Sequence, residues 1–369
     1  MMSNNIAVNA QACLACGRCA DHCIMDNLRL VLPPCRQASP LGVNYQAIMR
    51  LAAAGDSTGA ARALRKSTPF GGFLAVWGDK AAAQACSRGR KGGALDMARI
   101  LEWLVKKEEA LVYGAALAPY ARSDKKVAVI GSGAAGLQAA HDLRQCGYAV
   151  DVFEASPAIG GTLLFQPSEG SSPTEDALLP PIPAEVLQKT VAMLEKMGIA
   201  FHAFTPKGQA ELAALRAEYD AVVCACGKGA TLPADAFGQV EGNLFAAGAC
   251  VKNQKQLNTL QAMASGAQAA RAVRNLLEGF SVDYESDRRA ALGLEGFRGL
   301  SDAQASMPDV PPVHAASGAY SDAEARQEAA RCLGCGGPVE RNMTCWYCLP
   351  CEVVCPVHAL HVRIPYLVR

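Results

Sequence analysis

Two cysteine ladders with identical spacing lie near opposite ends of this 369-residue chain, and they constrain its fold more than any other feature. Both follow the pattern C-x2-C-x2-C-x3-C, as CLACGRCADHC and as CWYCLPCEVVC. Their members are Cys13, Cys16, Cys19 and Cys23 in the first ladder and Cys345, Cys348, Cys351 and Cys355 in the second. Two-residue gaps let a tightly turned loop aim three thiolates at one iron–sulfur cluster. Structural zinc usually takes two separated cysteine pairs, and zinc and disulfides are the alternatives that this pattern disfavours.

The ladders by themselves do not complete their clusters. Pro356 follows the second ladder, as in bacterial-type ferredoxins, where the fourth cysteine of a ladder typically serves a neighbouring cluster. We expect Cys332 and Cys335 to join the C-terminal module as ligands, and Cys35 and Cys86 to complete the front. Twelve terminal cysteines match three all-cysteine [4Fe–4S] clusters, within a range of two to four. The other four are expected to be small buried residues: Cys146, Cys224, Cys226 and Cys250.

Composition excludes several partners. Thirty-five basic and 34 acidic side chains leave a formal charge of +1, which favours neither nucleic acid nor an anionic membrane surface. No apolar run approaches the roughly 20 residues that a membrane span needs. The first residues, MMSNNIAVNAQ, lack the basic and apolar regions of a secretory signal. The cysteines are therefore expected in a reducing compartment, the cytoplasm, as metal ligands.

A dinucleotide-binding fingerprint occupies the middle of the chain. The strand-like run KKVAVI opens onto GSGAAG, a helical segment follows, and AVDVFEA then reads as a second strand. This β-α-β order predicts an α/β fold with a parallel sheet. Gly131 permits the tight turn, Gly133 lets the backbone approach the pyrophosphate, and Gly136 allows close packing of helix and strand. Glu154 ends the second strand, where a carboxylate can accept hydrogen bonds from the adenosine ribose.

The sequence resembles the glutamate synthase small-subunit group of flavoproteins, which includes the N-terminal part of dihydropyrimidine dehydrogenase. The similarity covers most of residues 10–280. It is carried by the first ladder, ACSRG, the segment KKVAVIGSGAAGLQAAHDLRQCGYAVDVFEASPAIGG, EYDAVVCACG and GNLFAAGAC. The tail from EARQEAARCLGCGG resembles the ferredoxin-like end of some larger members. The resemblance implies FAD, held around these positions: Gly131, Ser132, Gly133, Ala134, Ala135, Gly136, Glu154, Gly160, Gly161, Gly227, Gly248 and Ala249.

The chain departs from this group in two places. The group carries a second dinucleotide fold for NAD(P)H between the segments that here end at Gly227 and begin at Gly242, where only 14 residues remain. A β-α-β unit needs about 30 residues, so the nicotinamide domain is expected to be deleted. The Gly-Asp of the group's second FAD motif is Gly248-Ala249 here, which removes a carboxylate from the flavin side.

These features predict four segments: a helical [4Fe–4S] domain at 1–120, an FAD-binding domain at 121–280, a linker at 281–330 and a ferredoxin-like module at 331–369. The expected function is electron transfer by a subunit of a larger oxidoreductase. Its expected partners are a catalytic metalloenzyme subunit and a ferredoxin-like or flavoprotein electron carrier. The alternative is a self-contained NAD(P)H:ferredoxin reductase in which nicotinamide reacts directly at the FAD. No catalytic acid, base or nucleophile is expected.

Overall fold

The computed structural model describes residues 5–110, 123–164, 182–203, 205, 208–227, 230–252, 257–284, 302–316, 318–340 and 345–363. The chain divides into two compact units. The cysteine unit consists of Met1–Leu64, Gly78–Lys107 and Glu285–Arg369, and the Rossmann unit of Arg65–Trp77 and Glu108–Tyr284. The structure thus groups the chain differently from the four expected segments, because parts of the first, third and fourth share one unit. Among the helices described, none combines the length and apolar character needed to cross a bilayer.

The Rossmann unit is built on a six-stranded sheet in the order β5-β4-β3-β6-β8-β7. Its strands are β3 (Lys126–Ile130), β4 (Ala149–Phe153), β5 (Ala200–His202), β6 (Ala221–Cys224), β7 (Gln239–Glu241) and β8 (Leu244–Ala246). Every neighbouring pair is parallel except β7 with β8 at the edge. The central residues of β3 and all of β6 are buried, as continuous apolar runs in a covered parallel sheet require. The predicted α/β fold with a parallel sheet is confirmed.

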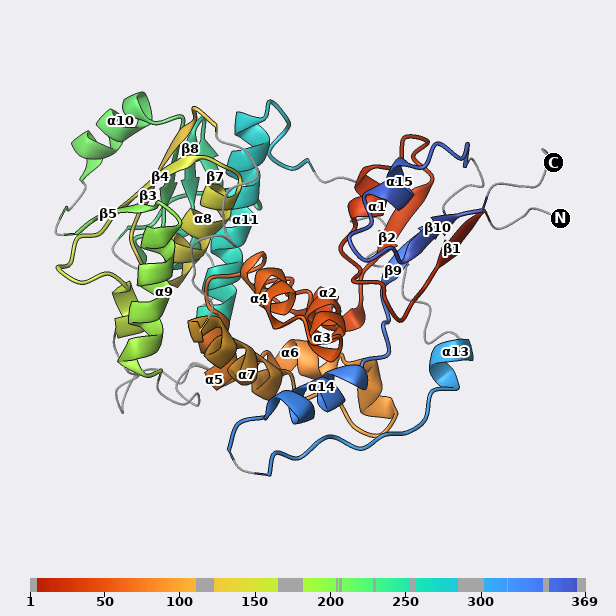
Figure 1. Cartoon of the computed structure of the whole chain (residues 1–369). Helices are drawn as coiled ribbons and strands as arrows, with labels where there is room; N and C mark the ends of the chain where they lie inside the picture. The colour runs from red at the N-terminus through yellow and green to blue at the C-terminus, as the bar shows by residue number, and fades with distance from the viewer. Residues whose placement is uncertain are drawn as a thin grey trace. The chain divides into compact units, whose positions relative to one another are not determined.

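Helices α8 (Ala134–Gln145) and α11 (Thr259–Leu277) pack closely against each other in the Rossmann unit (Figure 1). A Cβ atom on Gly266 would lie 2.1 Å from the carbonyl oxygen of Ala135, so only glycine permits this approach. Asn258 caps α11, its side chain accepting a hydrogen bond from the Gln261 amide. The remaining helices of this unit are α5 (Gly71–Trp77), η2 (Gly161–Leu164), α9 (Ala184–Lys196), α10 (Gln209–Glu218) and η5 (Gly248–Cys250).

The cysteine unit combines short helices with two small sheets. Its helices are α1 (Arg18–Asp21), α2 (Pro34–Ala38), α3 (Tyr45–Ala53), α4 (Ser57–Arg65), α6 (Lys80–Gln84), η1 (Ser87–Arg90), α7 (Met97–Ala110), α13 (Asp302–Ala305), α14 (Asp322–Ala330) and α15 (Pro350–Val353). Side chains cap several of them, among them α3 by Asn44, α6 by Asp79 and α14 by Ser321. Such caps satisfy amides that the first helical turn leaves unpaired. These caps fix the residues at which the preceding loops end and the helices begin.

The two small sheets each join one strand from either end of the chain. Strand β1 (Ile6–Val8) pairs antiparallel with β10 (Leu360–Val362), and β2 (Leu28–Val31) with β9 (Gly337–Glu340). Figure 1 shows these pairs as red strands beside blue ones. Strands β1 and β9 precede the two ladders, and β2 and β10 follow them. Each half of this region is therefore a strand, a ladder and a second strand. The strands of one half pair with those of the other, as in two copies related by a two-fold axis. The side chains of Leu28, Leu30 and Leu360 belong to one buried cluster between the halves.

The backbone repeats the same symmetry. Each ladder adopts the left-handed conformation at three corresponding positions, which are Ala15 (φ 48°), Gly17 (φ 87°) and Asp26 (φ 51°) in the first and Tyr347 (φ 58°), Leu349 (φ 68°) and His358 (φ 48°) in the second. Five of the six are not glycine, and left-handed backbone costs such residues about 1 kcal/mol or more each. Repetition of this strain at matching positions indicates that the ladder loops are shaped to direct their thiols.

Candidate cofactor sites

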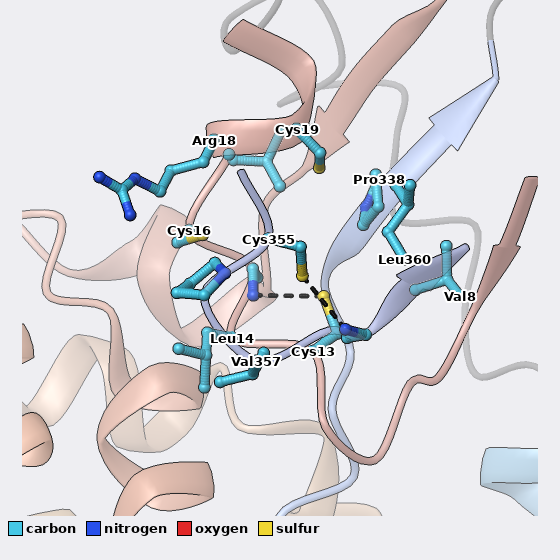
Figure 2. Close-up of a pocket in the computed structure, with 15 residues that line it drawn as sticks. Val8, Cys13, Leu14, Cys16, Arg18, Cys19, Pro338, Cys355, Val357 and Leu360 are labelled. Atoms are coloured by element: carbon cyan, nitrogen blue, oxygen red, sulfur yellow. Dashed lines mark hydrogen bonds between the residues drawn. The ribbon is translucent and has the colours of Figure 1, made fainter. Parts of the chain in front are cut away.

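Twelve cysteines form three groups of four in the cysteine unit, and each group lines its own cavity. The first tetrad, Cys13, Cys16, Cys19 and Cys355, lines one cavity (Figure 2). It therefore takes three cysteines from the first ladder and the last cysteine of the second. Backbone amides donate hydrogen bonds to two of its sulfurs, from Ala15 to Cys13 (3.4 Å) and from Ala359 to Cys355 (3.1 Å).

The second tetrad mirrors the first. It consists of Cys23, Cys345, Cys348 and Cys351, which line a second cavity. The amide of Asn27 donates to the Cys23 sulfur over 3.3 Å, as the amide of Ala359 does to Cys355. Cys348 is exposed, whereas Cys23 and Cys351 are buried. Trp346, which also lines this cavity, is 72% exposed, so this site lies near the surface of its unit.

The third tetrad contains four cysteines from outside the ladders. They are Cys35, Cys86, Cys332 and Cys335, and they line a third cavity. Cys35 lies on α2, Cys86 directly precedes η1, and the other two follow α14. The expectation from the sequence placed one pair at the front and the other in the C-terminal module; the structure instead brings both pairs together. The twelve cysteines predicted as ligands thus line these three cavities, and the last cysteine of each ladder lies with the first three of the other.

The residues of each tetrad fit an iron–sulfur cluster by their chemistry. In the part of the chain that the structure describes, no three His, Cys, Asp or Glu side chains converge as ligands of a single metal ion. The thiols instead surround cavities, and their donor set is all sulfur, as in [4Fe–4S] proteins. Amide hydrogen bonds to the sulfurs are one of the means by which proteins set cluster potentials.

Burial raises the pKa of several thiols in the tetrads. Desolvation, followed by repulsion from Cys16 and Cys13, raises the pKa of Cys19 to about 12. Desolvation likewise raises the pKa of Cys35 well above its ordinary value, with Cys332 and Cys86 adding to the effect. Thiols of this kind stay protonated near neutrality unless a metal displaces the proton. Cluster assembly at these sites should therefore release protons.

Buried side chains hold the ladder loops in place. The amide of Gln46, which is 1% exposed, donates to the carbonyl oxygens of Cys13 and Gly336, both over 2.9 Å. Its oxygen accepts from the Gly336 amide over 2.7 Å. Asn44 donates to the carbonyl oxygen of Leu14 over 3.0 Å. Gln46 also lines the cavity of the third tetrad, so it lies between that site and the first.

Two buried polar groups beside the third tetrad have donors without regular partners. Arg88 is 3% exposed, and its Nε and Nη1 atoms have no hydrogen-bond acceptor. The Ser87 hydroxyl also lacks a regular partner. Burial raises the pKa of the nearby Cys335 thiol to about 11, and the interaction with the Ser87 hydroxyl acts in the opposite direction. Buried donors without acceptors are rare and costly. Both residues line this cavity, where an anionic cluster would supply acceptors.

The fingerprint turn of the Rossmann unit lies between β3 and α8. Gly131 has φ +103°, and a Cβ there would lie 2.4 Å from the carbonyl oxygen of Ala225. A Cβ on Gly136 would lie 1.9 Å from the Gly131 oxygen. Gly133 differs, because a Cβ there would meet no atom within 4 Å. This open space lies before the N-terminus of α8, where backbone amides and the helix dipole favour a phosphate.

Glu154 holds this turn together. Its carboxylate accepts hydrogen bonds from the amide and hydroxyl of Ser132 (2.9 and 2.5 Å) and of Ser156 (2.9 and 3.0 Å). Burial opposes ionisation, but these hydrogen bonds outweigh it and lower the pKa of Glu154 below its usual value. Four donors occupy the acceptor capacity of a carboxylate. A ribose hydroxyl would therefore have to replace one of the serine donors.

Other predicted cofactor residues surround the same turn. A Cβ on Gly161 would lie 3.0 Å from the Cα of Gly133, and the Gly160 amide donates to the Ser132 hydroxyl over 2.8 Å. A Cβ on Gly248 would lie 3.0 Å from the Cβ of Ala135. Gly227 has φ +64° and open space on its Cβ side, and Ala249 is exposed. The structure thus brings these dispersed segments to the carboxyl edge of the sheet, where α/β proteins bind their ligands.

The interval expected to lack a nicotinamide domain contains little regular structure. Between β6 and β8, the described residues form only the three-residue strand β7, which pairs antiparallel with β8. Leu232 makes a single parallel bridge with Val251. The sheet therefore passes from β6 to β8 without a second β-α-β unit among the residues described.

Replacing Gly133 by alanine should remove bound flavin without unfolding the unit. The new methyl group meets no protein atom within 4 Å but enters the space before α8. Gly136→Ala is the matched control, because its methyl group collides with the Gly131 carbonyl and should lower stability as well. The measurements are flavin absorbance after gel filtration and the thermal unfolding midpoint. Retention of flavin by Gly133→Ala would show that phosphate does not bind there.

A parallel sheet, a glycine turn and an acidic residue at the end of the second strand are the features of a dinucleotide-binding domain. Residues 125–274 match the family model described as pyridine nucleotide-disulphide oxidoreductase. The domain formed by residues 125–274 is accordingly similar to the pyridine nucleotide-disulphide oxidoreductases, and this similarity supports FAD as its cofactor.

Three relatives confirm the resemblance recognised in the sequence. The PreT subunit of NAD-dependent dihydropyrimidine dehydrogenase from Salmonella typhimurium is 29% identical over 206 residues, 54% of this chain and 47% of PreT. The beta subunit of NADP(+)-dependent formate dehydrogenase from Moorella thermoacetica is 34% identical over 122 residues, 32% and 16% of the two chains. The small chain of glutamate synthase [NADPH] from Bacillus subtilis is 33% identical over 113 residues, 30% and 20%. The match spans about half the length of PreT and less of the other two.

Proposed function

We propose that this chain is an electron-transfer subunit of a larger oxidoreductase, with FAD in the Rossmann unit and three [4Fe–4S] clusters in the cysteine unit. When bound, FAD exchanges one or two electrons and each cubane exchanges one. The chain would thereby relay electrons between a catalytic metalloenzyme partner and a ferredoxin-type or flavoprotein partner. The observation that carries this proposal is the sorting of twelve cysteines into three complete tetrads.

The residues of the tetrads have distinct tasks in this proposal. None of the cysteines of the first and third tetrads is exposed, which would limit the access of water to their sites. Gln46 lies between these two sites. The orphaned donors of Arg88 would stabilise negative charge at the third tetrad. The exposed Cys348 makes the second tetrad the best candidate for electron exchange with a partner. Because buried groups and charges around a cluster set its potential, the three sites should differ in potential.

A partner is required because the described residues offer no second dinucleotide fold beside the proposed FAD site. Three relatives are named as a subunit, a beta subunit and a small chain, which supports membership in a complex. The partners proposed here follow from the cofactors rather than from those names. Proteins that co-purify with the chain under anaerobic conditions identify them.

Analysis of the anaerobically purified chain tests the proposal. Flavin released by heat should be FAD and not FMN, because the fingerprint turn and Glu154 recognise an adenosine diphosphate moiety. Three cubanes correspond to about 12 iron atoms per chain. FMN as the released flavin would refute the cofactor assignment. Iron near four atoms per chain would refute the three-cluster arrangement.

A further inference from the structure

Two cysteines of the Rossmann unit, outside the tetrads, lie beside each other at the carboxyl edge of the sheet. Cys226 follows β6 after one residue, and Cys250 ends η5, which follows the neighbouring parallel strand β8. The Cys250 thiol lies within hydrogen-bonding reach of the Cys226 sulfur. It also lies 3.0 Å from the carbonyl oxygen of Cys224 and 3.1 Å from that of Ala247. Both side chains belong to the same apolar cluster.

The two thiols have unequal environments. Cys250 is fully buried, whereas Cys226 is partly exposed. The hydrogen bond from Cys250 lowers the pKa of Cys226 despite partial burial, and the same interaction, with burial, raises the pKa of Cys250. Besides the pair itself, the titratable group that acts on them is Cys224, which is buried. Tyr219, in the same cluster, is engaged with Asp151 over 2.9 Å.

We propose that Cys226 and Cys250 form a reversible disulfide, with Cys226 as the attacking thiol, Cys250 as the resolving thiol and a small-molecule disulfide as the co-reactant. An accessible sulfur beside a buried second thiol is the arrangement that thiol–disulfide exchange requires. The exchange uses none of the tetrad cysteines, and disulfide formation does not itself require the proposed electron-transfer function.

The exchange balances in two steps. The Cys226 thiolate attacks one sulfur of R–S–S–R, a Cys226–S–S–R bond forms, and R–S⁻ leaves. Cys250 then loses its proton and attacks the Cys226 sulfur, which closes the intramolecular disulfide and releases a second R–S⁻. The two cysteines together lose two electrons and two protons, and the small disulfide becomes two R–SH.

The position of the pair gives this oxidation a structural meaning. A Cβ on Gly131 would lie 3.1 Å from the Cα of Cys226, so the pair adjoins the fingerprint turn. A disulfide would tie the segment after β6 to η5, which contains Gly248 of the second FAD motif. The oxidation state of the pair would thus act on two of the segments proposed to hold FAD.

Peptide mapping tests the proposal on the anaerobically purified chain with its cofactors in place. The protein is incubated with oxidised glutathione, its remaining thiols are alkylated, and the digest is analysed by mass spectrometry. Wild-type protein should yield a peptide pair linked through Cys226 and Cys250. Cys250→Ser should stop at a glutathione adduct on Cys226, and Cys226→Ser should give neither product.

Cys146 supplies the internal control. It is also partly exposed, but burial raises the pKa of its thiol to about 11. Modification of Cys226 in the Cys250→Ser variant should therefore be faster near neutrality and reach half its maximal rate at a lower pH. Absence of the linked peptide in wild type, or adduct formation on Cys250 in Cys226→Ser, would overturn the proposal. A modification rate of Cys226 no higher than that of Cys146 would do so too.

Discussion

Replacing Cys355 by alanine should remove the same cluster as replacing Cys16, although the two cysteines belong to ladders at opposite ends of the chain. Both line the cavity of the first tetrad. Iron should fall from about 12 to about 8 atoms per chain in either variant, because one cubane is lost. The two variants should lack the same signal in low-temperature electron paramagnetic resonance of the reduced protein, and both should retain FAD.

Cys23 and Cys348 provide the reciprocal test. Cys23 belongs to the first ladder but lines the second tetrad with Cys348. Alanine variants of these two should therefore resemble each other and differ from the Cys355 variant. Cys146→Ala, outside every tetrad, should keep all the iron. If the Cys355 and Cys348 variants lose one shared signal, each ladder fills a cubane of its own and the exchange of fourth cysteines is wrong.

Reduction of the flavin by NADH or NADPH should be slower by roughly 100-fold or more than reduction by dithionite or a low-potential ferredoxin. A nicotinamide ring must be held face-on to the flavin, and that requires contacts to the rest of its dinucleotide. In the described residues between β6 and β8, β7 is the sole strand or helix available for this. Ferredoxin or dithionite can instead deliver electrons through the cysteine unit.

Anaerobic stopped-flow absorbance of the purified chain measures both rates. The Cys355→Ala variant separates the two routes, because the loss of a cluster should slow reduction by ferredoxin without creating a nicotinamide site. Rapid bleaching of the flavin by NADH, saturating at micromolar concentrations, would support the alternative function of an NAD(P)H:ferredoxin reductase. That function would then replace the electron-transfer proposal.

Local patterns identified the Rossmann unit from the sequence. The strand, the glycine turn and the following helix are consecutive, so the amino-acid order alone was enough to assign roles to Gly131, Gly133 and Gly136. The hydrogen bonds that the Glu154 carboxylate accepts could not be predicted in the same way. Its four donors come from Ser132 and Ser156, and the Ser132 contact depends on the packing of β4 beside β3.

Long-range pairing accounts for what the sequence could not predict. The ladder spacing indicated that a fourth ligand must come from elsewhere, but it did not say which cysteine. That choice follows from antiparallel strands that join the two halves, such as Leu28 opposite Glu340. The pair of Cys226 and Cys250 was also missed, since free cysteines are usually buried structural residues. The available signal was that each follows one of two strands that proved to be neighbours.

The pairing of β1 with β10 and of β2 with β9 has a consequence for biosynthesis. The side chain of Asn27 donates a hydrogen bond to Glu340 across 313 positions. The first tetrad is also incomplete until Cys355 has been synthesised. Contacts of such separation form late and slowly. If the tetrads hold the proposed clusters, their assembly must wait until residues 332–355 have been synthesised.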